Sequence, residues 1–96
     1  MPFAEIITSP PIEGLMAAFR YGRSIELTLD NGTLHMVKIT MLEHQSHTGQ
    51  LFGFEGTVTA SSDESSFPTG QRVQGYLITS RPQHGRIRRL VDKEAA

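Results

Sequence analysis

The chain has 96 residues, of which 38% are hydrophobic, and a chain of this length forms one domain with a single core. It contains no cysteine, which excludes disulfide bonds and thiolate metal sites. No basic segment followed by an apolar run opens the sequence, and no apolar stretch has the length of a membrane span. We therefore expect a cytoplasmic protein with no membrane partner.

The charges are unevenly distributed along the chain, although the formal net charge of −1 favours no class of partner. Residues 1–64 hold three Lys or Arg and eight Asp or Glu, whereas residues 65–91 hold five Arg and no acid. The order of the strands decides whether these arginines form one basic face or are mixed with the acids. The sequence leaves both arrangements open.

Two segments precede the expected strands. Residues 1–9 have no clear hydrophobic period and are expected to form an extended arm or an edge strand. Ser9 before two prolines predicts the start of a helix, and Gly22 is placed for a left-handed C-terminal cap. The helix is expected over residues 10–21, with an apolar stripe formed by Ile12, Leu15, Met16 and Phe19.

The strongest local signal is a β-hairpin over residues 24–42, where alternating apolar residues flank Asn31–Gly32. Asn and Gly both adopt positive φ readily, so a two-residue type I′ turn is expected, and Thr28 then faces His35. His35 would lie on the face away from the core. The face toward the core would carry Ile25, Leu27, Leu29, Leu34 and Met36.

Beyond Met36 the apolar positions change phase along the strand. They move to Val37, Ile39 and Met41, and a regular strand cannot accommodate this without turning its side chains over. A bulge or a sharp bend near Met36 or Val37 is therefore expected. Strands that bend in this way are typical of small barrels.

Three more strands are expected after a polar loop. The first covers residues 51–60 and contains Gly53 and Gly56, which permit strong coiling or close approach of another backbone. The other two cover residues 71–81 and 86–91 and are joined by a short turn.

The segment 61–70 has the lowest sequence complexity in the chain. It is rich in serine and acid and ends in Pro68 and Gly70, which predicts an exposed and mobile loop. Phe67 is expected to anchor it. A plain linker and a binding loop are both consistent with this composition.

These elements predict a mainly β protein with one N-terminal helix, in which five or six strands form a small bent-sheet barrel. A single domain covers residues 1–96, with the barrel strands over residues 24–91. The charged residues 92–96 are expected to form a frayed tail.

The best candidate site is the basic turn and strand near the C-terminus, which contain Arg81, His84, Arg86, Arg88 and Arg89. Guanidinium groups match phosphates and carboxylates, and Tyr76 and Phe67 are nearby aromatic residues that can stack on a base. These residues predict binding of RNA or another anion. The alternative is that the arginines are solvated and only prevent an edge strand from aggregating.

No motif predicts catalysis, and no cofactor or metal is expected. Glu43, His44 and His47 could begin a zinc site, but a zinc site needs three or four convergent ligands, and histidines in a polar loop are more often solvated. The sequence has no nucleophile elbow, no phosphate loop and no carboxylate pair with a catalytic spacing.

The order of helix, bent hairpin, strand, variable loop and two more strands over residues 10–91 resembles the Sm-like small barrel, a family of ring-forming RNA-binding proteins. The matching features are the helix at residues 10–21, LTLDNG at residues 27–32 and HGRI at residues 84–87, where the family has a basic glycine turn. This resemblance implies a homo-oligomer with single-stranded RNA as a partner.

A second resemblance is to PilZ domains, which are barrels that bind cyclic di-GMP through an arginine motif and a later acidic-x-Ser-x-x-Gly motif. RYGR at residues 20–23 and HQSHTG at residues 44–49 are similar to these motifs. The resemblance implies a degenerate nucleotide-binding domain.

We therefore expect a non-catalytic binding module that contacts RNA or another anionic ligand through its basic C-terminal turn and strand. The alternative in a different class is a structural or adaptor homo-oligomer with a protein partner and no small ligand. Strand edges and the apolar side chains of Phe3, Tyr76 and Ile78 favour self-association. An enzyme that uses the histidines is the third option.

Overall fold

A computed structural model describes residues 4–44, 51–78 and 84–90 of the chain. Within these residues the elements are β1 (Ala4–Thr8), α1 (Ile12–Tyr21), β2 (Ser24–Leu29), β3 (Leu34–His44), β4 (Leu51–Ser61), β5 (Arg72–Ile78) and β6 (His84–Arg89). The expectations for Phe3, His47, Arg81 and the tail at residues 92–96 lie outside the described residues. No helix in the described part of the chain is long and apolar enough to span a membrane.

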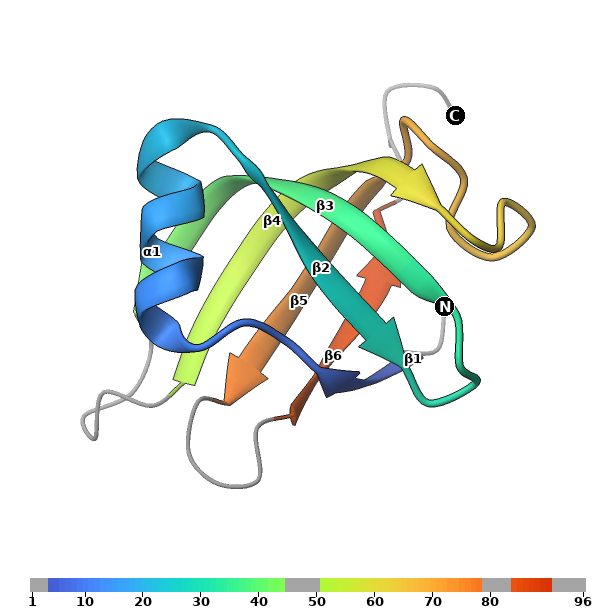
Figure 1. Cartoon of the computed structure of the whole chain (residues 1–96), viewed down its shortest axis with the longest axis horizontal. Helices are drawn as coiled ribbons and strands as arrows, with labels where there is room; N and C mark the ends of the chain where they lie inside the picture. The colour runs from blue at the N-terminus through green and yellow to red at the C-terminus, as the bar shows by residue number, and fades with distance from the viewer. Residues whose placement is uncertain (1–3, 45–50, 79–83, 91–96) are drawn as a thin grey trace.

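The six strands form a closed antiparallel barrel in chain order (Figure 1). Each strand pairs with the next, and β1 also pairs with β6, where Ala4 faces Ile87. The predicted fold class, a mainly β protein with one N-terminal helix and a small six-stranded barrel, is confirmed. Residues 4–8, expected as part of an arm or an edge strand, form β1, which has a neighbouring strand on each side.

The helix lies where the sequence predicts it but begins two residues later. Pro11 occupies the N-cap position without a side-chain hydrogen bond, so Ser9 does not cap the helix. Gly22 ends it in the left-handed conformation, with φ 67°, and the Arg23 amide donates to the Ala18 carbonyl at 2.8 Å. This C-terminal geometry is the one that Gly22 predicts.

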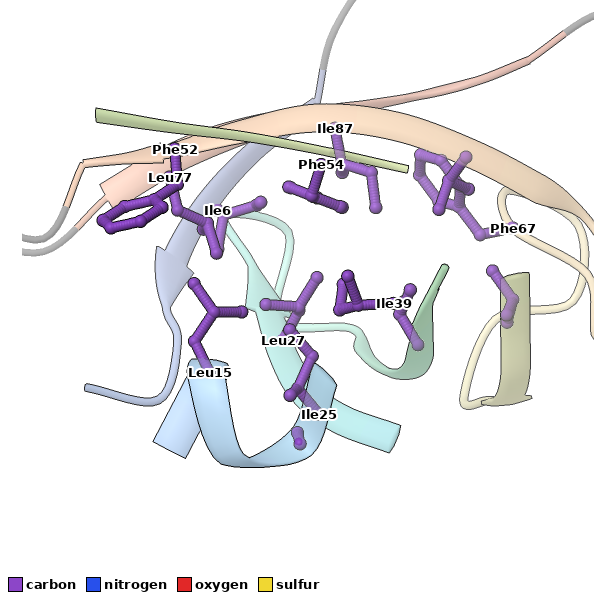
Figure 2. Packing of buried hydrophobic residues seen from close by; sticks show 14 of the residues in the cluster. Ile6, Leu15, Ile25, Leu27, Ile39, Phe52, Phe54, Phe67, Leu77 and Ile87 are labelled. Atoms are coloured by element: carbon purple, nitrogen blue, oxygen red, sulfur yellow. The ribbon is translucent and has the colours of Figure 1, made fainter. Parts of the chain in front are cut away.

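The buried face of α1 is narrower than the predicted apolar stripe. Leu15 and Ala18 are buried, and Figure 2 shows Leu15 directed toward Ile6 and Leu27 of the core. Met16 and Phe19, two of the residues in the predicted stripe, remain 43% and 38% exposed. The helix stands beside one end of the barrel (Figure 1). Its buried side chains are small or aliphatic.

The hairpin between β2 and β3 forms with a register one residue away from the prediction. Leu27 faces His35 and Thr28 faces Leu34, because the loop has three residues rather than two. Gly32 alone in this loop has positive φ, at 84°, and its amide donates to the Leu29 carbonyl at 3.0 Å. This geometry is typical of a type I turn followed by a glycine bulge, and the type I′ prediction is wrong.

The change of register reverses which side chains of β3 face the core. His35, Val37 and Ile39 are buried, whereas Leu34 is exposed and Met36 is only partly buried. The predicted placement of His35 outside and of Leu34 and Met36 inside is therefore wrong. With His35 inward, the apolar positions from His35 to Ile39 keep one phase.

Bulges do occur between β3 and β4. Between Met36 and Val37 the register shifts by one residue, and the extra residue, Thr59, belongs to β4 rather than to β3. A second shift between Ile39 and Met41 leaves Thr40 as the extra residue of β3. A bulge is therefore present at the predicted position, but it inserts its extra residue in β4 and does not make the change of phase in β3 that the prediction required.

The loop at residues 61–70 is folded on itself by hydrogen bonds. Asp63 accepts bonds from the Ser65 and Ser66 hydroxyls, and Glu64 accepts bonds from the Thr69 amide at 3.0 Å and the Thr69 hydroxyl at 2.7 Å. Phe67 is 7% exposed and belongs to the core, so it anchors the loop as expected. The segment is a compact turn rather than a solvated linker.

Candidate functional site

The candidate basic residues lie mainly on one outward face of the barrel. On β6, Gly85 and Ile87 face the core, so Arg86 and Arg88 point away from it. On β5, Gln74 and Tyr76 also point outward, between the buried positions of that strand. We call the outward surface formed by Gln74, Tyr76, Ile78, His84, Arg86 and Arg88 the β5–β6 face.

The pairing of β5 with β6 brings these side chains together two by two. Tyr76 faces Arg86, Gln74 faces Arg88 and Ile78 faces His84. Side chains that face each other across antiparallel strands have Cβ atoms about 5 Å apart, and alternate residues along a strand are about 6.6 Å apart. The two arginines are therefore adjacent neighbours, and each has a polar or aromatic side chain of β5 beside it.

Arg86 is paired with an acid from β1, which lies on the other side of β6. Its Nη2 is 3.4 Å from Glu5 Oε1, and its Nε donates to Glu5 Oε2 at 3.4 Å. The two side chains are 50% and 47% exposed, so water and salt screen the attraction, and pairs of this kind contribute about 1 kcal/mol or less. An incoming anion can compete with Glu5 for this guanidinium at small cost.

Arg88 is oriented by an uncharged acceptor. Its Nε and Nη2 donate to Gln74 Oε1 at 3.2 and 2.8 Å, which fixes the plane of the guanidinium against β5. Arg72, at the start of β5, lies 3.5 Å from Glu55 of β4. The surface around the β5–β6 face thus carries both signs of charge.

Two predicted site residues do not join this face. Arg89 faces Val73, whose side chain is buried, so it lies on the inward side of β6 at the end of that strand. Phe67 is buried with its ring edge-on to His35, at a centroid distance of 5.4 Å, and it offers no exposed face for a base. Arg81 lies outside the described residues. Of the predicted site residues that the structure describes, His84, Arg86, Arg88 and Tyr76 lie on this face.

Glu43 and His44, which could begin a zinc site, do not belong to a group of convergent ligands in the described part of the chain. No group of three or more His, Cys, Asp or Glu side chains gathers among residues 4–44, 51–78 and 84–90. Glu43 and His44 belong to β3, and His47 lies outside this set.

His35 is a buried polar residue, although the sequence predicts it on the outer face of the hairpin. His35 is 2% exposed, with its Nδ1 2.8 Å from the Ser61 hydroxyl and its Nε2 2.9 Å from the Thr33 hydroxyl. The Thr33 hydroxyl donates to Asn31 Oδ1 at 2.7 Å, so it accepts from Nε2–H, and Ser61 donates to Nδ1. Both ring nitrogens of His35 therefore have a hydrogen-bond partner when the imidazole is neutral.

The charge state of His35 links its burial to stability. Burial lowers the pKa of His35 below 6.5, and the carboxylates of Asp63 and Glu64 offset this only in part. The pKa of Asp63 is itself lowered by the hydroxyls of Ser65 and Ser66, and the pKa of Glu64 by the amide and hydroxyl of Thr69. Both acids therefore stay ionised at the pH values where His35 titrates.

We predict that the free energy of unfolding falls between pH 7 and pH 5. The unfolded chain binds a proton at His35 near pH 6.5, before the folded chain does, so protonation favours the unfolded state as the pH falls through this range. Stability from Asp63 and Glu64 is lost only below about pH 4. Urea midpoints measured at pH 8, 7, 6 and 5 test this, with His35→Leu as the variant in which the decrease from pH 7 to 5 becomes smaller. Equal midpoints at pH 7 and pH 5 in the unmodified protein would contradict the assignment.

Comparison of the chain with protein-family models, with curated proteins and with solved structures found no match. The fold and the geometry of the β5–β6 face are therefore the basis for a functional assignment.

Proposed function

We propose that the protein is a non-catalytic binding module that holds single-stranded RNA, or another anionic ligand, on the β5–β6 face. The observation that carries the proposal is the register of β5 with β6, which puts Arg86 beside Tyr76 and Arg88 beside Gln74 on one outward surface. In this arrangement two forked cations and one aromatic ring lie on the same outward surface, where one ligand can contact all three.

Each group has a distinct part in the proposed complex. Arg86 and Arg88 bind successive phosphates, because a guanidinium donates two parallel hydrogen bonds to one phosphate. Tyr76 stacks on a base, which adds affinity without selecting a sequence. Glu5 competes with the ligand for Arg86, because it already accepts hydrogen bonds from that side chain.

The test is fluorescence anisotropy with short labelled RNAs over a series of KCl concentrations. Release of counterions from single strands gives a slope of about −0.7 in log K against log salt for each engaged cation, so Arg86 and Arg88 together predict about −1.4. The double variant Arg86→Gln, Arg88→Gln should bring the slope close to zero, whereas Glu5→Gln should strengthen binding. The double variant Arg20→Gln, Lys38→Gln, at exposed positions of α1 and β3, is the matched control with the same change of charge.

The absence of RNA binding below about 100 μM at low salt would overturn this proposal, because that affinity is weaker than the scale of ordinary micromolar complexes. An unchanged salt slope in the double variant would do the same. Cyclic di-GMP is titrated in parallel, since the PilZ-like hypothesis predicts binding that depends on Arg20 and Arg23. Of the second PilZ-like motif, residues 45–49 lie outside the described residues.

The Sm-like hypothesis has support from the small closed barrel and faces two differences. HGRI at residues 84–87, expected as a basic glycine turn, lies within β6. The resemblance covers residues 10–91 and begins with the helix, whereas β1 precedes α1 and pairs with both β2 and β6. We keep as part of the proposal that the protein forms a ring, binds RNA and is cytoplasmic.

The second candidate function is a structural or adaptor homo-oligomer. Closure of the barrel removes most of the free strand edges that favoured self-association, but large apolar side chains are exposed elsewhere. They are Ile7, Met16, Phe19, Tyr21, Leu34 and Met41. Light scattering on the samples used for anisotropy separates the candidates, because an oligomer that binds no RNA supports this one.

A further inference from the structure

One edge of β2 lacks a neighbouring strand along most of its length. β3 pairs with β2 from Ser24 to Thr28, but on the opposite side β1 reaches only Thr28 and Leu29. Figure 1 shows the chain leaving β1 and diverging from β2 toward α1. Within the described residues, Ser24–Leu27 therefore present an open strand edge between β1 and α1.

The register shows which peptide groups point to this edge. The Leu29 amide donates to the Thr33 carbonyl at 2.9 Å, so Leu29 bonds toward β3. Hydrogen-bonding direction alternates along an antiparallel strand, so Leu27 and Ile25 also bond toward β3. The amide and carbonyl of Glu26, and those of Ser24, point to the open edge instead. They can pair with an added strand.

A groove of about 580 Å³ lies along this edge. One wall is the link from β1 to α1 at residues 8–10, and another is the face of α1 that carries Gly14, Ala17 and Ala18. Their short side chains leave the space open. Ser24, Ile25, Glu26 and Met36 complete the lining, together with Arg23 at one end. The volume lies within the range of ligand sites.

The groove has charges of opposite sign at two positions along β2. Arg23 lies just before β2, and its guanidinium carbon is 5.8 Å from the centroid of the Tyr21 ring. Among the described residues, no carboxylate forms an ion pair with Arg23. Within the same residues, no Lys or Arg forms an ion pair with Glu26, which lies three residues further along. The groove therefore offers a cation at the start of β2 and an anion near its middle.

We propose that this groove binds the C-terminal end of an extended peptide from a partner protein, added antiparallel to β2. An antiparallel strand ends where β2 begins, which brings its terminal carboxylate to Arg23. Its third residue from the end then faces Glu26, where a lysine is favoured. Its last residue then faces Ser24, beside the short side chains of α1 in the groove lining, where an apolar group of modest size fits. The site is separate from the β5–β6 face and does not depend on it.

The test uses fluorescein-labelled hexapeptides that have lysine at the third position from the end and alanine, valine or leucine at the end. Each is made with a free C-terminal carboxylate and as the C-terminal amide. We expect the carboxylate peptides to bind and the amides to bind about tenfold more weakly, because a charge-assisted hydrogen bond is lost. Arg23→Gln should remove the difference between the two forms.

Ala17→Leu should abolish binding by filling the groove, and leucine is a good helix former, so α1 is retained. Arg20→Gln does not alter the groove lining and should bind like the unmodified protein. No binding of any carboxylate peptide at 1 mM, equal binding of acid and amide, or full binding by Ala17→Leu would each overturn the proposal.

Discussion

Replacing Gly75 by alanine is expected to destabilise the barrel by about 3 kcal/mol or more. A Cβ at this position would overlap the Arg86 carbonyl oxygen of β6 and would approach the Phe54 ring and the Ile87 Cα to 3.0 Å. The nearest atom belongs to a neighbouring backbone, which cannot move without breaking the β5–β6 pairing. Only glycine permits the two strands to approach in this way.

Urea unfolding followed by circular dichroism measures this effect. Ala60→Val, at an exposed position of β4, is the control and should change stability by less than about 0.5 kcal/mol. A loss below about 1 kcal/mol in Gly75→Ala would mean that β5 and β6 are not this close. Because Gly75 lies between Gln74 and Tyr76, that result would also change the geometry of the β5–β6 face.

Truncation of Phe67 to alanine should cost about 3 kcal/mol, although Phe67 lies in a serine-rich loop. Its ring is buried and contacts His35 edge-on, with an angle of 71° between the ring planes. Removing it opens a cavity and admits water to the imidazole. The decrease in stability from pH 7 to pH 5 should therefore become smaller in the variant, because the pKa of His35 is no longer lowered by burial to the same extent.

Phe67→Leu serves as the matched control, because it retains most of the apolar volume and should lose much less stability than the alanine variant. A loss below about 1 kcal/mol in Phe67→Ala would contradict the packing of the loop into the core. It would favour the mobile linker that the composition of residues 61–70 predicts.

The sequence predicts the elements of this fold better than their register. Asn31–Gly32 locates the hairpin correctly, but the same residues suit a two-residue and a three-residue loop, and the choice moves every side chain of β3 to the other face. The phase of Val37 and Ile39 was the available signal. It agrees with His35 facing inward, whereas counting from a two-residue turn places His35 outside. The partners of the buried imidazole, Thr33 and Ser61, are not recognisable from the sequence.

Closure of the barrel depends on contacts that are distant in sequence. The pairing of Ala4 with Ile87 joins the two ends of the described chain, and no local pattern in residues 1–9 indicates it. The fold of residues 61–70 depends on hydrogen bonds to Asp63 and Glu64. Composition alone predicts that these acids are solvated.

The placement of Arg86 and Arg88 on one face of β6 needs only the strand period, but the sequence alone leaves open whether the arginines form one basic face. The pairing of Arg86 with Glu5 needs the closed barrel and could not be predicted. The groove beside β2 needs the divergence of β1 from β2, which is also a tertiary feature.

The most direct test of the proposed function is a titration of the isotope-labelled protein with a short single-stranded RNA at low salt, followed by two-dimensional NMR. The proposal predicts that the largest shifts occur at Gln74, Tyr76, Arg86 and Arg88, that they decrease as KCl is raised, and that the double variant Arg86→Gln, Arg88→Gln lacks them. Shifts confined to residues outside the β5–β6 face, or no shift at 1 mM RNA, would contradict it.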